Sequence, residues 1–485
     1  MESGLGLLPR PRRLGSALAV LALAAGSVLV LAGTANAGGK HGKADPLPIV
    51  FVHGGAGSAQ QYESVARRFS SNGFPDERIE TLEYNSASGA AIAGAPARLE
   101  ELINDLRDRF DVDQVNLVGH SLGTFVSNNF LADPARRALI RHYVGVDGAS
   151  NTTCRDVWEP DPNQNIECMG IWAQPQGARA VGSTNHSFEG QQTHVEAATS
   201  PESFAFQYEF FLGKEPKTNL ILPEPPGQVK ISGRAVDFPD NTGVDGGTVE
   251  IFKVHGNTGH RKSDDPKATF ELGPDGNWGP VKVNGKKHYE FVITRDGTDR
   301  EHHLYQQQFI RDDRWVRLLT SPPGSTIPEN TNIGPDHTTT VVVRQKEWWT
   351  THPSGRNDDL EISTSVPGPG DEPPVDVLQN VTSNGNIGIH VHDEAPGDQV
   401  SSLGIIAFFD ALPFQTGIDV FMPASDPLGT ISIENAPRGD ASQTQELNIP
   451  NWPSDGHATT SYLNDYVQGI NSWGECKGKK HSPCK

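Results

Sequence analysis

The chain has 485 residues and a formal net charge of -20 at pH 7. This length is enough for two or three domains with their own hydrophobic cores. So acidic a surface repels nucleic acid and anionic membranes, and we expect no nucleic acid as a partner. The simplest interpretation of the charge is that it keeps an extracellular protein soluble.

Residues 1–37 are predicted to be a signal peptide. Arginines within residues 10–13 precede an uncharged apolar run over 14–33, and the sequence Ala-Asn-Ala at 35–37 has the form that a signal peptidase cuts. We therefore expect a secreted protein, cleaved after Ala37. The apolar run is nearly long enough to span a bilayer, so a retained membrane anchor is the alternative.

Strands and helices alternate through the first half of the chain. Strands are predicted over residues 48–52, 79–84, 115–118 and 142–147, and helices over 60–70, 96–110 and 122–130, with a last helix from about 200. In residues 96–110, apolar side chains recur at helical spacing and charged ones occupy the opposite face. This alternation predicts an α/β fold with a mostly parallel sheet.

The pattern Gly119-His120-Ser121-Leu122-Gly123 is predicted to be a nucleophile elbow. It follows a buried strand and precedes a helix, as such an elbow requires. The glycines two positions before and after Ser121 leave room for a sharp turn that lifts the serine hydroxyl above the sheet. A plain Gly/Ser turn is the alternative, which this strand-to-helix context disfavours.

A serine nucleophile needs backbone or side-chain donors that stabilise the oxyanion formed when it attacks. The sequence His53-Gly54-Gly55 follows the first predicted strand and lacks the spacing of a phosphate-binding loop. We therefore predict that the backbone amides of Gly55 and Leu122 are the oxyanion donors.

The serine also needs a base and an acid that orients the base. Asp147 is the predicted acid, because it ends the strand after the elbow strand, at the sheet edge where α/β proteins build their sites. Its alternatives are other aspartates of this half of the chain: Asp133, Asp156 and Asp161. His194 is the predicted base, and His186 is its alternative, since both follow the acid in the order Ser, Asp, His.

The four cysteines form two local pairs, Cys154 with Cys168 and Cys476 with Cys484. In a chain with an export signal, this spacing predicts two short-range disulfides. Zinc binding by these cysteines is the weaker interpretation, because neither pair has a Cys-x-x-Cys or clustered histidine pattern. We expect no metal and no cofactor.

Helical periodicity stops after the Pro-rich hinge at 223–227. Short strands separated by Gly, Asp and Asn turns then predict a β-sandwich accessory domain over 228–320, a second all-β domain over 326–470 and a Cys-containing tail over 471–485. The predicted strands are 229–236, 247–254, 268–272, 289–294, 340–344, 387–391, 405–409, 418–421 and 430–433.

Two features of the second all-β domain have both a functional and a structural interpretation. The apolar stretch 405–414 is a core strand with its turn or, less favoured, a lipid-contact surface. His390 and His392 share one face of a strand and can bind a metal ion, but chance alternation is the favoured explanation.

The motifs of the first half together resemble secreted α/β-hydrolase lipases and esterases. They are His53-Gly54-Gly55, the elbow around Ser121, Asp147, and His194 followed by Ser200-Pro201-Glu202. The layout is similar to that of long-chain lipases in which an α/β-hydrolase domain, here 38–222, precedes a large all-β region. The resemblance implies Ser121 as nucleophile, His194 as base and Asp147 as orienting acid. One departure is that the acid follows the strand directly after the elbow strand.

The sequence thus predicts a secreted carboxylic ester hydrolase that cleaves acylglycerols or similar lipid esters through an acyl-enzyme. Its β domains are candidates for contact with a lipid interface. A short-chain esterase or polyester depolymerase is one alternative. A non-catalytic extracellular binding protein on a hydrolase scaffold is another. No prediction of the oligomeric state follows from the sequence.

Overall fold

The computed structural model describes residues 45–150, 154, 166–174, 184–353, 355, 357–366, 374–382, 384–395, 397–438 and 443–466. The predicted signal peptide and the predicted pair Cys476 and Cys484 lie outside these residues, as do Asp156 and Asp161. In the part of the chain that is described, no helix is both long and apolar enough to cross a bilayer.

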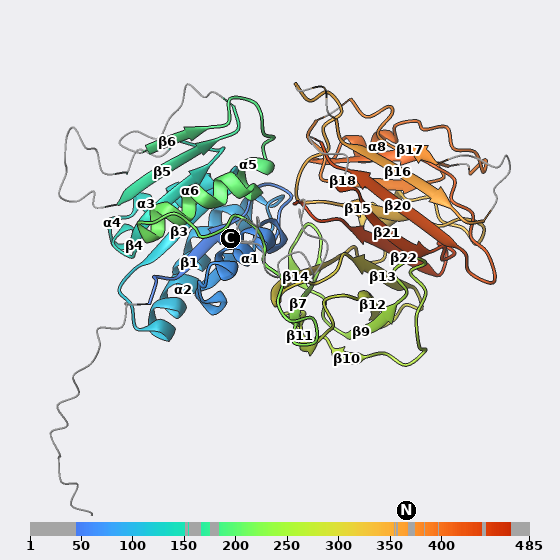
Figure 1. The fold of residues 1–485 in the computed structure, drawn as a ribbon, viewed down its shortest axis with the longest axis horizontal. Helices are drawn as coiled ribbons and strands as arrows, with labels where there is room; N and C mark the ends of the chain where they lie inside the picture. Colours follow the sequence, from blue (N-terminus) through green and yellow to red (C-terminus); the bar gives the residue numbers. More distant parts are fainter. Residues whose placement is uncertain are drawn as a thin grey trace, which may run out of the picture. The chain divides into compact units, whose positions relative to one another are not determined.

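The first region of the described chain is built on a parallel sheet of six strands in the order β2-β1-β3-β4-β5-β6 (Figure 1). They are β1 (Ile49–Val52), β2 (Ile79–Leu82), β3 (Val115–His120), β4 (Ile140–Val146), β5 (Glu167–Trp172) and β6 (Thr184–Ser187). Every residue of β1 and β3 is buried, as expected for central strands covered on both faces. The predicted α/β fold with a mostly parallel sheet is confirmed.

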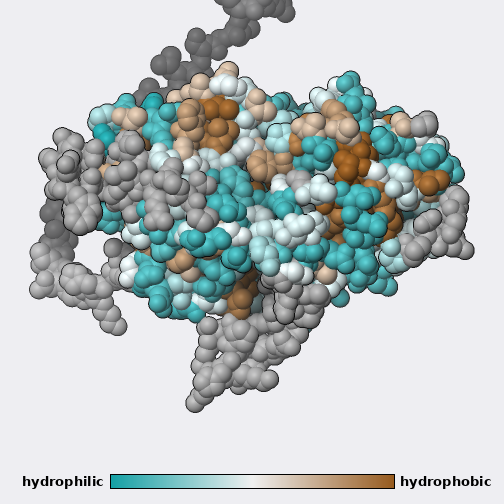
Figure 2. Space-filling view, turned by 90° about the horizontal axis from the view of Figure 1, so that it is seen from above, coloured by the Kyte–Doolittle hydropathy of each residue, from teal (hydrophilic) through white to brown (hydrophobic). Residues whose placement is uncertain are grey.

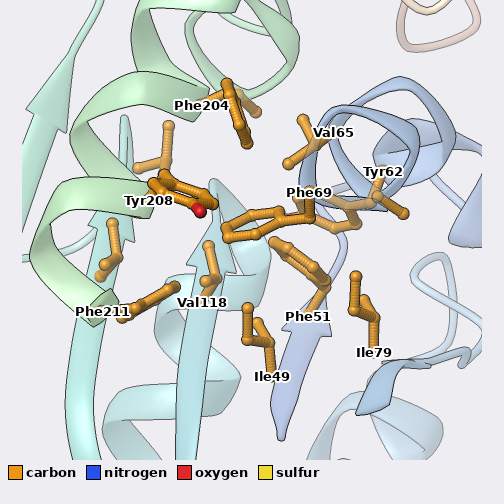
Figure 3. Packing of buried hydrophobic residues seen from close by; sticks show 14 of the residues in the cluster. Ile49, Phe51, Tyr62, Val65, Phe69, Ile79, Val118, Phe204, Tyr208 and Phe211 are labelled. Carbon is orange, nitrogen blue, oxygen red and sulfur yellow. The ribbon is translucent and has the colours of Figure 1, made fainter. Parts of the chain in front are cut away.

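Two sets of helices bury the two faces of this sheet. On one face, Phe69 of α1 (Glu63–Ser71) and Phe204 and Tyr208 of α6 (Pro201–Leu212) pack over Phe51 and Val118 of the strands (Figure 3). The opposite face packs against α2 (Gly89–Phe110) and α3 (Leu122–Ala132). Shorter helical segments are η1 (Ala59–Tyr62), η2 (Asp76–Arg78), α4 (Pro134–Arg137) and α5 (Glu196–Thr199).

The structure departs from the predicted elements of this region in two places. Helix α2 begins at Gly89, seven residues before the predicted start at Pro96, because the Ser88 side chain accepts a hydrogen bond from the Ala91 amide and caps the helix there. Strands β5 and β6 run through residues for which no strand is predicted from the sequence. Strand β6 has no apolar alternation and is extended through its pairing with β5. Cys154 and Cys168, the first predicted pair, form a disulfide.

The region after the hinge is rich in β-strands, in line with the prediction of sandwich-like all-β domains. An eight-stranded sheet has the order β10-β9-β12-β13-β22-β15-β18-β19 among the described residues. Its strands are β9 (Gly247–Val254), β10 (Ala268–Glu271), β12 (His288–Arg295), β13 (Glu301–Gln306), β15 (Thr340–Val343), β18 (Gly388–His392), β19 (Gln415–Asp419) and β22 (His457–Tyr462).

Two smaller sheets pack against the eight-stranded sheet. One contains β7 (Lys230–Asp237), β8 (Thr242–Gly243), β11 (Asn277–Lys282) and β14 (Asp313–Thr320). The other contains β16 (Asp359–Thr364), β17 (Val375–Asp376), β20 (Thr430–Ala436) and β21 (Gln445–Pro450). Separate apolar cores join each small sheet to its part of the large one, so the region consists of two sandwiches that share a sheet.

The predicted strand over 405–409 is wrong, because residues 407–410 form a short helix, α8 (Ala407–Asp410). A second short helix, α7, spans Thr326–Glu329. Ile406 and Phe409 are buried, which agrees with the core interpretation of the apolar stretch 405–414. Packing of Phe409 against His390 at a ring separation of 4.0 Å fixes this helix on the sheet.

Hydrophilic residues cover most of the described surface on the face that Figure 2 shows, and hydrophobic residues gather in several separate areas. The large apolar side chains that are exposed among the described residues are Phe125, Ile333 and Val400. They lie far apart in the sequence. Single exposed apolar side chains of this kind are normal on a protein surface.

Candidate active site

Ser121 occupies a strained turn between β3 and α3. Its φ of 51° and ψ of -121° are unusual for a residue with a side chain. The Ser121 amide donates a 2.9 Å hydrogen bond to the Val146 carbonyl of β4, which holds the turn against the sheet. Ser121 lines a small pocket at this end of the sheet together with Gly55 and His120.

The glycines on both sides of Ser121 are required by close backbone packing. A Cβ atom on Gly123 would lie 2.2 Å from the Val52 carbonyl oxygen, and one on Gly119 would lie 2.7 Å from the Gly123 carbonyl oxygen. Real Cβ atoms do not come within 3.0 Å of a non-bonded oxygen atom. The turn can therefore pack between β1 and α3 only with glycine at these two positions.

The loop after β1 passes directly beside Ser121. A Cβ atom on Gly54 would lie 3.0 Å from the Ser121 Cβ and 2.9 Å from Nδ1 of His120. Gly55 lines the same pocket as Ser121. On the other side of Ser121, Leu122 is the first residue of α3, so its amide has no acceptor within the helix.

Asp147 and His194 are joined by a short hydrogen bond. His194 Nδ1 lies 2.5 Å from Oδ2 of Asp147, and the Ala173 amide donates to Oδ1 at 3.0 Å. Because a carboxylate only accepts, the proton is on Nδ1, and Nε2 is the imidazole atom that can take a proton. Burial disfavours the charged imidazole, but Asp147 and then Glu347 favour it and raise the pKa of His194 above its ordinary value.

His120 connects the elbow to the loop that carries His194. Gln61 Nε2 donates to Nδ1 of His120 at 2.5 Å, and Nε2 of His120 donates to the His194 carbonyl at 3.0 Å. Burial holds the pKa of His120 well below its ordinary value, so the ring is neutral and each nitrogen has one role. No hydrogen bond joins Ser121 Oγ to His194 among the described residues, an arrangement common in sites without substrate.

A carboxylate from the β-rich region holds the His194 loop on its other side. Glu347 is completely buried and accepts hydrogen bonds from Thr193 Oγ1 at 2.5 Å, the Val195 amide at 2.6 Å and the Glu196 amide at 3.1 Å. Burial raises its pKa above the ordinary value, against these hydrogen bonds. The residues on both sides of His194 are therefore fixed to Glu347.

Ion pairs extend this attachment. Arg438 lies 2.5 Å from Glu196 and donates to the Glu347 carbonyl at 2.5 Å, and Lys346 lies 2.8 Å from Glu196. Burial opposes ionisation of Glu196, but Lys346 and Arg438 lower its pKa to about 2. Arg438 also pairs with the buried Asp358, so the charges of this network compensate one another.

Phe414 places an aromatic ring over the candidate base. Its ring is stacked on that of His194, with a centroid separation of 6.0 Å and an interplanar angle of 7°. Phe414 lines the same pocket as Ser121, and its φ is 62°, a strained value for a non-glycine residue. It belongs to the apolar stretch predicted to be core or lipid-contacting, and it forms a wall of the pocket.

The alternative acid and base candidates have other contacts. Asp133 accepts a 2.8 Å hydrogen bond from the Ala135 amide and caps α4. His186 lies in β6 and stacks on Phe206 with a ring separation of 3.8 Å. Of the candidates in the described residues, only Asp147 and His194 are joined to each other.

A larger cavity adjoins the Ser121 pocket. It has a volume of about 1090 Å³, its open mouth included, and shares Gln345 and Ile387 with the lining of the Ser121 pocket. Its lining is mostly apolar, with Leu319 and Val341 among the side chains that the β-rich region contributes. The larger cavity therefore lies next to the Ser121 pocket, with Gln345 and Ile387 bordering both.

Family models match three successive stretches of the chain. A model described as the alpha/beta hydrolase fold matches residues 48–174, and one described as a lipase C-terminal domain matches residues 227–323. A third, described as a C-terminal domain, matches residues 326–467. The first stretch contains Ser121 and Asp147, and His194 follows it.

Solved structures match the chain at low identity. A protein from Listeria innocua is 13% identical, with a TM-score of 0.26, over 36% of this chain and 96% of that chain. For the metagenome-derived lipolytic enzymes LipS and LipT, the match is 12% identical, with a TM-score of 0.26, over 35% and 95%. Lipase B of Aspergillus fumigatus is 14% identical, with a TM-score of 0.25, over 36% and 54%. The comparison with curated proteins gives no match.

The observed fold and the family models agree with each other. The parallel sheet with a sharp turn after its central strand β3 lies in the stretch matched by the hydrolase model, and the strands after the hinge lie in the other two. Residues 48–174 therefore have the α/β-hydrolase fold, and they are followed by a β-rich C-terminal region that is similar in part to a lipase C-terminal domain.

Proposed function

We propose that the protein is a carboxylic ester hydrolase in which Ser121 is the nucleophile, His194 the base and Asp147 the orienting acid. The observation that carries the proposal is the hydrogen bond between His194 Nδ1 and Asp147 at the sheet end that carries the strained Ser121 turn. This combination supplies a nucleophile, a proton acceptor and a group that fixes the tautomer of that acceptor.

In the proposed reaction, His194 Nε2 takes the proton of Ser121 as Oγ attacks the ester carbonyl carbon. The carbonyl oxygen becomes negatively charged, and the amides of Gly55 and Leu122 donate hydrogen bonds to it. Collapse of this intermediate breaks the bond to the alcohol oxygen, which takes the proton from His194. Water then attacks the acyl-enzyme with His194 again as base, which releases the carboxylic acid and restores Ser121.

The cavity beside Ser121 supports a substrate with a long acyl chain. Its mostly apolar lining suits methylene groups, each of which contributes about 0.8 kcal/mol when it is removed from water. The match to a lipase C-terminal domain points to the same class, so we take acylglycerols or similar lipid esters as substrates. A short-chain esterase or polyester depolymerase is the second candidate function. A polymer segment bound in the cavity, in place of a long acyl chain, would favour the depolymerase.

Secretion is part of the proposal. The predicted signal peptide, with cleavage after Ala37, supports it, as does the disulfide between Cys154 and Cys168, because disulfides persist in oxidising compartments. Contact of the β-rich region with a lipid interface is proposed as well, since the apolar cavity is lined largely by that region.

The Asp147→Asn substitution is expected to lower the pKa of His194. Asp147 favours the charged imidazole, so the wild-type imidazole should titrate above its ordinary value and the variant lower. Histidine-selective NMR titration measures this, with the His194 signal assigned by its loss in His194→Ala. Asp133→Asn is the matched control and should leave the titration unchanged. An unaltered His194 pKa in Asp147→Asn would show that Asp147 is not its partner.

Ser121→Ala should lower kcat for p-nitrophenyl esters by at least about a thousandfold, because the proposed acyl-enzyme forms on the Ser121 hydroxyl. Steady-state kinetics on the purified protein measures the loss, and circular dichroism checks the fold. Ser263→Ala, an exposed serine in the β-rich region, is the control and should retain full activity. Ester cleavage by Ser121→Ala at the wild-type rate would sink the assignment.

Val341→Trp should fill part of the apolar cavity and shift the preference for acyl length. Excluding two or more methylene groups removes about 1.6 kcal/mol or more, so kcat/KM for p-nitrophenyl palmitate should fall about tenfold or more. The kcat/KM for p-nitrophenyl butyrate should change little, because Val341 does not line the Ser121 pocket, where a short acyl chain would lie. Val400→Trp, at a position 52% exposed, is the matched control. Equal losses for both esters would contradict a long-chain site in this cavity.

A further inference from the structure

Three potential metal ligands converge where β13 pairs with β22. His303 Nε2 lies 2.9 Å from His457 Nδ1 and 3.4 Å from a carboxylate oxygen of Glu301, and the same oxygen lies 3.8 Å from His457 Nδ1. These three atoms form a compact triangle within 4.8 Å of one another. The proposed ester hydrolysis uses none of them.

The environment of His303 directs its Nε2 atom at this triangle. Nδ1 of His303 lies 2.7 Å from Glu290, a completely buried carboxylate that can only accept, so Nδ1 carries the proton. The lone pair of a neutral His303 is then on Nε2. A histidine that donates its second ring N–H to a carboxylate is the usual arrangement around bound metals, because it fixes the tautomer and raises ligand basicity.

Further contacts hold both the carboxylate and the ring in place. Arg261 donates to Glu290 at 2.6 Å, and the Tyr305 hydroxyl donates to Glu290 at 2.7 Å. The ring of Trp452 stacks on His303 with a centroid separation of 4.4 Å. Glu290 also neutralises the positive charge of Arg261, which would otherwise repel a cation at this site. His303 is thus held rigidly before any ion binds.

We propose that Glu301, His303 and His457 bind a divalent transition-metal ion, with zinc as the best match. Zinc binds histidine nitrogen at about 2.0–2.1 Å and carboxylate oxygen at about 2.0–2.2 Å, so tetrahedral ligand atoms lie about 3.3–3.5 Å apart. The three observed separations bracket that value. Imidazole ligands favour zinc over calcium or magnesium, which prefer oxygen.

An ion can reach this triangle from solvent. The Glu301 side chain is 39% exposed and that of His457 is 24% exposed, whereas His303 is completely buried. Water completes the coordination on the exposed side. The site is separate from the cavity next to Ser121, because none of Glu301, His303 and His457 lines that cavity.

The proposed ion is structural and joins two parts of the β-rich region. Strand β13 lies in the stretch matched by the lipase C-terminal domain, and β22 lies in the stretch matched by the last family model. The two strands pair in parallel, with Glu301 opposite His457. An ion bound by both strands would bind the folded protein and not the unfolded chain. Its binding would therefore raise the thermal stability.

The test uses the untagged full chain after removal of metals with a chelator. Zinc is added, free ion is removed by gel filtration, and bound zinc is counted by elemental analysis. One equivalent should bind and Tm should rise by a few degrees when zinc is well above its dissociation constant. Glu301→Gln and His457→Ala should each lose the bound zinc and the Tm shift. His255→Ala, an exposed histidine of the same region, should keep both.

Glu301→Gln preserves the shape of the side chain at a partly exposed position, so we expect this variant to fold. It therefore still tests the proposal if His457→Ala fails to fold. Absence of tightly bound zinc in the wild-type protein would overturn the proposal and leave the cluster as a hydrogen-bonded histidine pair. Zinc bound equally by the wild type and Glu301→Gln would also overturn it, because other histidines among the 17 of the chain would then be the ligands.

Discussion

The arrangement of the candidate site depends on one buried carboxylate of the β-rich region, Glu347, which holds the loop that carries His194. Glu347 is removed from water, and burial of an unpaired carboxylate would be strongly unfavourable. Three donors from residues 193–196 form hydrogen bonds to it. If either the loop or Glu347 moved, buried polar groups would lose their hydrogen-bond partners, which is unfavourable. The orientation of His194 toward Asp147 follows from this constraint.

The hydrolase region therefore does not complete its own site. His120 fixes the His194 carbonyl from the elbow side, whereas Glu347 and Arg438 fix the neighbouring residues from the β-rich side. Phe414 adds an aromatic wall, and the large apolar cavity opens into the same region. A β-rich region that supplies these parts acts as a component of the site, beyond any role in contact with a lipid interface.

The parts of the site that follow from chain order and local pattern were predictable from the sequence. Ser121 is marked by its glycines and by the strand before it, and Asp147 by its place at the end of the next strand. Chain order allows both His186 and His194 as the base, and the hydrogen bond to Asp147 is the physical reason that favours His194. The parallel sheet and the β-rich second half followed from hydrophobic periodicity.

The parts that depend on long-range contacts were not predictable. Glu347 lies 154 residues from its partner Thr193, and no local motif marks it. Phe414 stands in an apolar stretch whose pattern indicates a core. Strand β6 has no apolar residue, so only its pairing with β5 reveals it. His303 and His457 meet because two distant strands pair in parallel, which the sequence does not encode at any fixed spacing.

The most direct test is the rate at which a fluorophosphonate probe labels the protein, with the labelled residue mapped by mass spectrometry. The probe forms a bond from serine Oγ to phosphorus and releases fluoride, which requires an activated serine. We predict that the probe labels Ser121. Labelling should be about tenfold or more slower in Glu347→Gln, with circular dichroism unchanged from the wild type. The exposed control Glu394→Gln should be labelled at the wild-type rate. Labelling at another residue, or equal rates in the wild type and Glu347→Gln, would contradict it.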